Sequence, residues 1–175
     1  IYIPPETKFE IFGVVIGFFR RFEWRITYLC WNLPHYSYSF ARDYLKKLLP
    51  SGKILEIGSG SGRDAKELIA LGYDYVGTDI SESLLKIAKS ENSKSEFLLK
   101  SVYDLGFKEN QFDGFWCSAM LLHVPKEKID LALQSIKESV RHEGIGFISI
   151  KKGEGESFVK RTDSGFRDER FFAFY

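Results

Sequence analysis

A glycine-rich turn between a short apolar segment and a predicted helix is the part of this sequence best suited to bind a ligand. Residues 54–62 read Ile-Leu-Glu-Ile-Gly-Ser-Gly-Ser-Gly, and a second apolar segment ends on the carboxylate of Asp79. Glycines let a backbone approach a ligand closely, and a carboxylate at a strand tip can accept hydrogen bonds from two ribose hydroxyls. The pattern therefore predicts a site for a cofactor that contains adenosine.

The spacing of the glycines distinguishes between such cofactors. A dinucleotide fingerprint, G-x-G-x-x-G, requires a glycine at position 63, where this chain has Arg63; its third glycine is Gly62. A P-loop is excluded because no Gly-Lys-Ser/Thr follows the turn. The pattern fits S-adenosylmethionine, which has adenine and ribose but no phosphate. A large charged side chain at position 63 is awkward for a pyrophosphate but not prohibitive, so an NAD-dependent oxidoreductase is the rival enzyme class.

The elements that must position these residues alternate between strand and helix. Short apolar segments predict five strands, at residues 53–57, 75–78, 96–99, 112–117 and 145–150. Between them we expect a helix that ends at Gly72, a helix capped by Ser81, and a helix from Pro125 to Gly144 with His142 in its last turn. This alternation predicts an α/β fold: a Rossmann-like, doubly wound, mostly parallel sheet with helices on both faces.

Residues 1–50 are predicted to form an aromatic, helical arm on the substrate side, ahead of a cofactor-binding domain at residues 51–175. The uncharged run at residues 11–19 is shorter than the roughly 20 residues of a membrane span. It predicts a helix packed on the domain, or alternatively a helix in a membrane interface. Within the arm, the candidate substrate contacts are His35, Tyr36 and Tyr38, because such side chains suit an enclosed, mostly apolar pocket. Alternatively, the aromatic residues of the arm cover a sheet face.

Composition limits the classes of partner. The 175 residues suffice for a sizeable core, and the formal net charge of +1 gives a nucleic-acid partner no electrostatic support. The two cysteines, Cys30 and Cys117, form neither a CxxC pair nor a metal site with the three histidines, so free thiols in a reducing cytosol are expected. We therefore expect a cytoplasmic protein that uses no metal, no nucleic acid and no membrane; the composition leaves its oligomeric state open.

Several linked motifs resemble one family. Residues 58–65 (Gly-Ser-Gly-Ser-Gly-Arg-Asp-Ala), 77–81 (Gly-Thr-Asp-Ile-Ser), 112–119, 121–125 (Leu-Leu-His-Val-Pro) and 153–156 follow the order found in class I S-adenosylmethionine-dependent methyltransferases, in particular small bacterial methyltransferase-domain proteins. The resemblance runs from about Lys53 to Tyr175 and implies methyl transfer to a small-molecule acceptor. Such enzymes usually add two strands after the fifth, so we expect a fragment with a sheet truncated there and an exposed edge on the fifth strand.

The resemblance also implies which residues bind the cofactor. Glu56 is expected near its amino end, Asp79 at the ribose and Ile80 on the adenine face. Ser101 occupies the position where the family commonly has an acidic residue for the adenine amino group; either adenine is held more loosely here or Asp104 reaches back. The other implied cofactor contacts, some made through the backbone, are Gly58, Ser59, Gly60, Gly62, Arg63, Val102, Cys117 and Ser118.

His123 is the candidate catalytic side chain. Methyl transfer is a displacement that mainly needs alignment, so a base is required only if the acceptor carries a proton. An imidazole titrates near neutral pH and suits that role. The alternative is a histidine that shapes the wall of the site. A non-catalytic, methyltransferase-like binding module is the second rival for the whole chain. The acceptor and its reacting atom are left open by the sequence.

Overall fold

The computed structural model describes residues 15–20, 27–28, 38–161 and 168–175, and it has two sheets. The larger sheet has seven strands in the order β2-β1-β7-β6-β3-β4-β5, and β8 pairs with β9 in a separate sheet. The strands span Val15–Arg20 (β1), Thr27–Tyr28 (β2), Lys53–Ile57 (β3), Asp74–Asp79 (β4), Glu96–Leu99 (β5), Phe112–Ser118 (β6), Val140–Ile150 (β7), Glu156–Arg161 (β8) and Asp168–Ala173 (β9).

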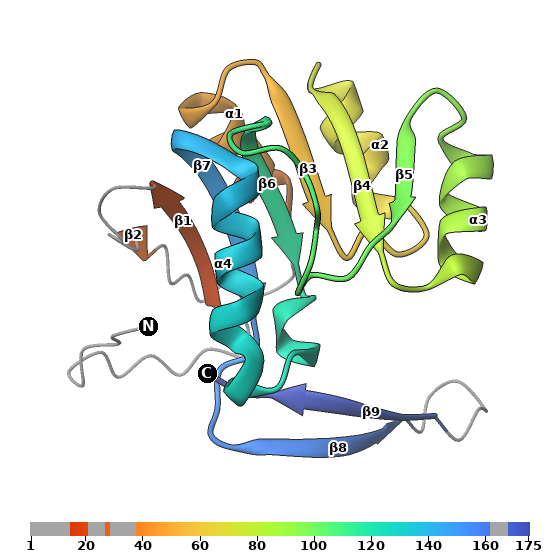
Figure 1. The fold of residues 1–175 in the computed structure, drawn as a ribbon, viewed down its shortest axis with the longest axis vertical. Coiled ribbons are helices and arrows are strands. Elements are labelled where there is room, and N and C mark those ends of the chain that lie inside the picture. Colours follow the sequence, from red (N-terminus) through yellow and green to blue (C-terminus); the bar gives the residue numbers. More distant parts are fainter. Residues whose placement is uncertain (1–14, 21–26, 29–37, 162–167) are drawn as a thin grey trace.

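The five predicted strands form the parallel part of the sheet. They are β3, β4, β5, β6 and β7, and all their pairings are parallel. The chain crosses over twice from β3 to β5 on one side, then returns to the other side of β3 with β6. The carboxyl ends of β3, β4 and β6 therefore meet near the point where the strand order reverses (Figure 1), which is where ligands bind in open α/β sheets. The predicted α/β class with a mostly parallel sheet is confirmed.

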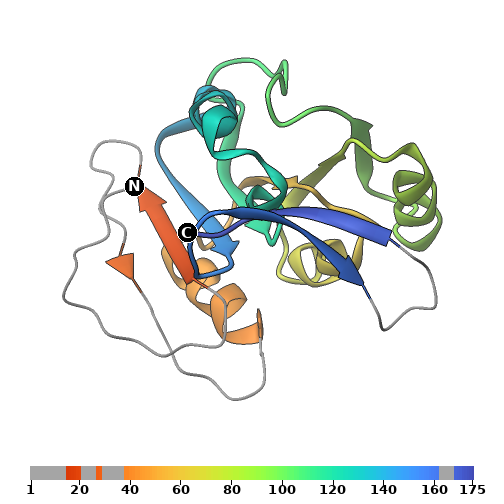
Figure 2. The ribbon, with the colours of Figure 1, turned by 90° about the horizontal axis from the view of Figure 1, so that it is seen from below.

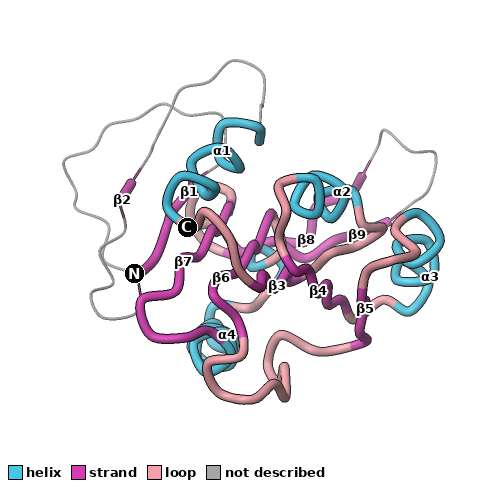
Figure 3. Tube along the Cα trace, turned by 90° about the horizontal axis from the view of Figure 1, so that it is seen from above, coloured by secondary structure: helices cyan, strands magenta, loops and turns pink. Residues whose placement is uncertain are grey.

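Helices cover both faces of this sheet (Figure 3). The α-helices are Tyr38–Leu48 (α1), Arg63–Ala70 (α2), Glu82–Glu91 (α3) and Ile129–Ser139 (α4). Residues of α1, α2 and α3 pack with Trp116 and Phe147 in one buried cluster, whereas residues of α4 pack with Phe112 and Leu105 in a second cluster. As predicted, the Ser81 side chain accepts a hydrogen bond from the Leu84 amide at the start of α3.

The prediction of a helix across residues 11–19 is wrong for residues 15–20, which form β1. This strand pairs antiparallel with β7 along its whole length, from Val15 opposite Ile150 to Arg20 opposite Ile145. The edge of the fifth predicted strand is therefore covered rather than exposed. Valine, isoleucine and phenylalanine favour a strand where an open edge can pair with the backbone, and a short apolar run alone does not distinguish strand from helix.

The predicted end of the last helix at Gly144 is also wrong. Helix α4 ends at Ser139 and β7 begins at Val140, so His142 lies in a strand rather than in the last turn of a helix. The β6–β7 register shifts between Phe112 and Gly114, and the buried Gly144 lies against Val140 and the Asp113 carbonyl, where a Cβ atom has no room. A glycine is therefore needed here because the packing is close where the register shifts. In the sequence, such a glycine looks the same as one that ends a helix.

The hairpin of β8 and β9 lies below the carboxyl ends of the parallel strands (Figures 1 and 2). Its six residue pairs run from Glu156 opposite Ala173 to Arg161 opposite Asp168. Backbone hydrogen bonds from the Gly153 amide to the Tyr175 carbonyl and from the Tyr175 amide to the Lys151 carbonyl close its base, each at 3.0 Å. The hairpin is thereby placed over the end of the sheet where the predicted cofactor residues gather.

Candidate functional site

The glycine turn joins β3 to α2 and is anchored on the neighbouring strand. The amides of Gly58 and Ser59 both donate to the Thr78 carbonyl, at 2.8 and 2.9 Å. Gly58, Gly60 and Gly62 have φ angles of 74°, 53° and 81°, which favour glycine. A Cβ atom on Gly58 would collide with Met120, whereas one on Gly60 would meet no atom within 4 Å. The turn is therefore packed on its inner side and open at Gly60.

Asp79 ends β4 beside the turn and helps to shape it. One carboxylate oxygen accepts from the Gly60 amide at 2.9 Å, and the other accepts from the Ser81 amide at 2.8 Å. Each oxygen retains capacity for another hydrogen bond, because a carboxylate oxygen has two lone pairs. The next residue, Ile80, is 76% exposed, an apolar side chain on open surface beside a partly buried carboxylate. This arrangement can hold a diol next to a flat apolar group.

Glu56 lies at the end of β3 and is almost fully buried, with 3% of its surface exposed. It accepts a hydrogen bond from the Tyr75 hydroxyl. Burial raises the pKa of the Glu56 carboxyl to about 8, and the nearby Asp64 carboxylate adds to that rise. The same burial and the Glu56 carboxyl raise the pKa of the Tyr75 hydroxyl. At neutral pH the carboxyl of Glu56 is therefore mainly protonated when no cation lies beside it.

A second buried carboxylate lies at the start of α2. Asp64 accepts from the Trp116 indole N–H at 3.0 Å and from Arg63 Nε at 3.2 Å. The Arg63 side chain itself is 79% exposed. With Glu56 and Asp79, three carboxyl groups surround the glycine turn, and among the described residues Arg63, which contacts Asp64, is the cation beside them. The site therefore favours a neutral or cationic ligand group over a phosphate.

The predicted adenine contacts lie just after β5. Ser101 and Asp104 form an isolated β-bridge, the Asp104 amide donates to the Ser101 carbonyl at 3.1 Å, and Ser101 Oγ accepts from the Tyr103 amide at 3.3 Å. Val102 packs in the core and has 9% of its surface exposed. The Val102 side chain therefore packs into the core beneath residues 101–104, so at this position the backbone is the part available to a ligand.

At the end of β6, Cys117 and Ser118 differ in their surroundings. Cys117 is fully buried, which raises the pKa of its thiol to about 12 and removes it as a nucleophile. Ser118 Oγ is buried and has no hydrogen-bond partner among the residues that the structure describes. A buried hydroxyl without a partner is costly, so it marks a position where a ligand can supply one.

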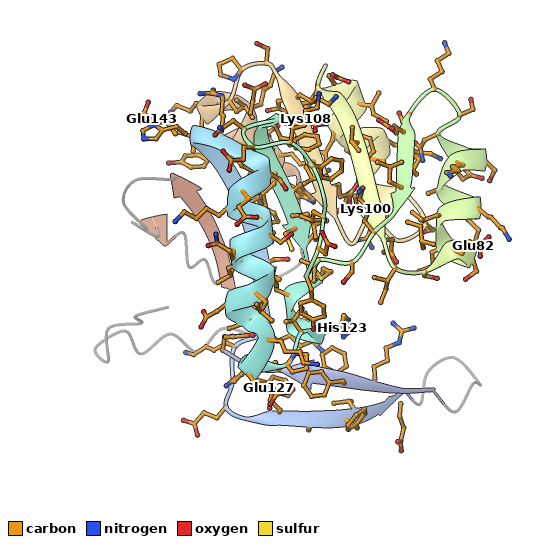
Figure 4. All side chains as sticks on the ribbon, in the orientation of Figure 1. Glu82, Lys100, Lys108, His123, Glu127 and Glu143 are labelled. Carbon is orange, nitrogen blue, oxygen red and sulfur yellow. The ribbon has the colours of Figure 1, made fainter. Side chains whose placement is uncertain are left out.

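His123 ends the 3-10 helix η1 (Leu121–His123) and lies between the carboxyl ends of the parallel strands and the hairpin (Figure 4). Its Nδ1 is 2.8 Å from the Phe171 carbonyl oxygen in β9, and its ring lies 4.9 Å from that of Phe172. His35 and Tyr36 lie outside the described residues. Tyr38 is the first residue of α1.

Sequence reasoning missed two groups of residues. The pairing of Tyr75 with Glu56 follows from the strand register, because Glu56 lies opposite Gly77. A Cβ atom added to Gly77 would lie 2.5 Å from the Tyr75 hydroxyl, so the glycine leaves room for that hydroxyl to reach Glu56. The alternation of Tyr75, Gly77 and Asp79 on one side of β4 was the available signal. The contribution of the hairpin carried no such signal, because its contacts to His123 connect residues far apart in the sequence.

Comparison with known proteins gives a consistent result. The family model described as "Methyltransferase domain" matches residues 55–148, more than half of the chain. The chain is 30% identical over 145 residues to a protein-L-isoaspartate O-methyltransferase of Pelodictyon phaeoclathratiforme, covering 79% of this chain and 62% of that protein. It is also 30% identical over 90 residues to a ubiquinone biosynthesis O-methyltransferase of Xanthomonas campestris pv. campestris, covering 47% of this chain and 38% of that protein. The chain thus spans less than two thirds of the length of each of these relatives.

Solved structures share the fold. A methyltransferase from Methanosarcina mazei described as SAM-dependent has a TM-score of 0.67 at 20% identity, covering 81% of this chain and 79% of that one. A structure described as a DhpI-SAM-HEP complex has a TM-score of 0.64 at 23% identity, covering 78% and 71%. Within the described residues, none of the helices has the length and apolar character needed to cross a membrane.

Proposed function

The chain belongs to the methyltransferase domain family, within the class I S-adenosylmethionine-dependent methyltransferases, and we propose that it binds S-adenosylmethionine and transfers the methyl group to a small-molecule acceptor. The observation that carries this proposal is the arrangement at the ends of β3 and β4. There an open glycine, Gly60, lies beside a carboxylate with spare acceptor capacity, Asp79, and an exposed apolar side chain, Ile80.

These residues fit the adenosine part of the cofactor. The Asp79 carboxylate accepts the two ribose hydroxyls while it keeps its hydrogen bonds to the turn. Ile80 packs against one face of adenine, and the backbone of Ser101 and Val102 meets the ring edge. When bound, the cofactor supplies an electrophilic methyl group; the protein residues hold it, exclude water and align the acceptor.

The charges around the turn support the other half of the cofactor. The sulfonium and the ammonium of S-adenosylmethionine are cations, and the buried carboxyl groups of Glu56 and Asp64 lie on the inner side of the turn. The Asp64 carboxylate at the start of α2 disfavours the pyrophosphate of NAD, for which the helix start would have to accept negative charge. The Ser118 hydroxyl, without a described partner, is a further group for the methionine end.

The proposed contacts to the methyl acceptor come from the N-terminal part of the chain. The named relatives act on different acceptors, so their names do not select one for this chain. We retain His35, Tyr36 and Tyr38 as predicted acceptor contacts and residues 1–50 as the part that carries specificity. Location in the cytoplasm is part of the same proposal, and the buried free thiol of Cys117 agrees with it.

Isothermal titration with S-adenosylhomocysteine and with NAD tests the proposal. We expect binding of the first only, and Asp79→Ala should weaken it by about 1.5–3 kcal/mol, which is roughly 10- to 150-fold in Kd. The matched control is Asp74→Ala at the other end of β4, where an exposed carboxylate lies 3.8 Å from Lys53. Binding of NAD alone, or equal affinity in folded Asp79→Ala, contradicts the proposal. Methyl transfer to a panel of small acceptors then separates an enzyme from a binding module.

A further inference from the structure

The hairpin is attached to the segment that carries His123 through both of its strands. From β9, the Phe171 carbonyl oxygen lies 2.8 Å from His123 Nδ1. From β8, the Glu156 carboxylate accepts from the Lys126 amide at 2.7 Å. Lys126 begins the 3-10 helix η2 (Lys126–Lys128), three residues after His123. The two contacts together fix the hairpin against the His123 loop.

The contact with Phe171 determines which nitrogen of the imidazole carries the proton. A carbonyl oxygen can only accept a hydrogen bond, so Nδ1 must donate and must be protonated. In the neutral ring the other nitrogen, Nε2, then has a free lone pair. The centre of the Phe172 ring lies 4.9 Å from that of the imidazole and limits rotation of the imidazole. The Lys151 ammonium lies 4.0 Å from the centre of the Phe172 ring and helps to hold that ring in place.

His123 is also connected to the glycine turn. Its amide donates to the Met120 carbonyl at 2.8 Å, and the Met120 side chain fills the space beside Gly58. The short helix η1 therefore joins the inner side of the turn to the hairpin. Because Nδ1 is engaged by the Phe171 carbonyl oxygen of the hairpin, Nε2 is the ring nitrogen left for an acceptor.

We propose that the β8–β9 hairpin positions His123 as its Nδ1–H tautomer, so that Nε2 accepts a proton from the methyl acceptor. The inference rests on the proposed function and names an acceptor class: a hydroxyl, amine or thiol that carries a proton. As the acceptor heteroatom bonds to the methyl carbon and the carbon–sulfur bond breaks, the proton passes from the heteroatom to Nε2. The resulting imidazolium returns the proton to water. Phe171 and Glu156 act through His123 and are positioning residues.

The tautomer can be measured without a substrate, by nitrogen-15 NMR on the full chain with labelled histidine. We expect His123 to show a protonated Nδ1 and an unprotonated Nε2, with its signals assigned by their loss in His123→Asn. A free imidazole favours the opposite tautomer, so a protonated Nε2 with a bare Nδ1 overturns the proposal. This measurement needs no turnover, so it tests the tautomer separately from the proposed function. The tautomer can prove wrong in a protein that binds the cofactor, and it can prove right in a protein that transfers no methyl group.

Two variants test whether the hairpin is the cause. The double variant Glu156→Ala/Phe172→Ala removes one attachment and the ring that limits rotation, and we expect its His123 signals to shift toward the opposite tautomer. Glu156→Gln keeps an oxygen acceptor for the Lys126 amide and should give the signals of the unaltered protein. If the folded double variant keeps the original tautomer, the Glu156 and Phe172 side chains do not position His123, and their part in the proposal fails.

Discussion

At the scale of single residues, the site depends on carboxyl groups that differ in their surroundings. Asp79 is partly exposed and accepts hydrogen bonds from two backbone amides, and its two oxygens can still accept further hydrogen bonds. Glu56 is enclosed, with Tyr75 as its donor, and burial raises its pKa to about 8. We therefore propose different roles for the two carboxyl groups: Asp79 would bind hydroxyls, and Glu56 would respond to a nearby cation.

Glu56 predicts how stability depends on pH. Because its pKa is raised from 4.5 to about 8 in the folded state, the folded protein binds the extra proton between these values. The contribution of Glu56 to stability is therefore greatest below pH 4.5 and is lost as the pH rises through 8. Glu56→Gln keeps the acceptor for Tyr75 and has no charge to bury.

We expect urea unfolding to give similar free energies for Glu56→Gln and the unaltered protein near the lower pKa. Above the higher pKa the variant should be more stable, by an amount on the order of a few kcal/mol, since each pKa unit corresponds to about 1.4 kcal/mol. Other titrating groups are common to both proteins and cancel in the difference. A difference that stays constant across this pH range would show that Glu56 is not buried in its neutral form.

At the scale of elements, the glycine turn combines two demands. At Gly58 the backbone packs against Met120 and leaves no room for a Cβ atom. At Gly60 the backbone is open, and an added Cβ atom would meet no atom within 4 Å. Gly72, after α2, has a similar left-handed conformation with φ of 86° and likewise no atom within 4 Å of an added Cβ. Gly60 and Gly72 therefore share their backbone strain and open surroundings but differ in distance from the site.

This pair provides a matched test. Gly60→Ala and Gly72→Ala should each lower the free energy of unfolding by about 1–2 kcal/mol, the cost of a left-handed alanine. Only Gly60→Ala should also weaken S-adenosylhomocysteine binding, on the order of tenfold or more, because its Cβ occupies the space of the ligand. Calorimetric titration of both variants measures this. Equal affinities in the two variants would remove Gly60 from the cofactor site.

At the scale of the whole molecule, the N-terminal part of the chain completes the sheet. Strand β1 covers β7, and β2 covers β1, both in antiparallel pairing. Gly17 lies between the two partners, opposite Ile148 in β7 and opposite Tyr28 in β2. Exposed strand edges promote association between chains, so this pairing protects an edge as well as stabilising the fold.

Gly17→Pro tests the role of β1. Proline cannot donate to a sheet and is poorly tolerated in a central strand, so we expect a loss of more than about 1 kcal/mol in the free energy of unfolding. Self-association measured by ultracentrifugation should increase, while cofactor affinity should not change because β4 lies across the sheet. Gly17→Ala keeps the amide and serves as the control. A proline variant as stable and as monomeric as this control would show that β1 does not protect the edge.

The sequence by itself determined the fold class, the parallel strands and the candidates around the glycine turn. These follow from local signals: apolar segments of strand length, glycines with required φ angles, a cap at Ser81, and a carboxylate at the tip of β4. The helix predicted over residues 11–19 failed in its described part because a short apolar run is compatible with either element, and pairing with β7 decided for a strand. The end of α4 was misplaced because Gly144 serves close packing rather than a helix end.

Only the tertiary structure decided the electrostatic and catalytic surroundings of the site. The raised pKa of Glu56 depends on its burial, and the hydrogen bond from Tyr75 across Gly77, which lowers that pKa, requires the register of β3 against β4. The tautomer of His123 depends on Phe171, which lies 48 residues later and meets it only because the hairpin folds back under the sheet. Local sequence encodes backbone preferences, but burial and long-range contacts arise only when the whole chain packs. Candidate cofactor residues could therefore be proposed from the sequence, whereas the surroundings that set the pKa of Glu56 could not.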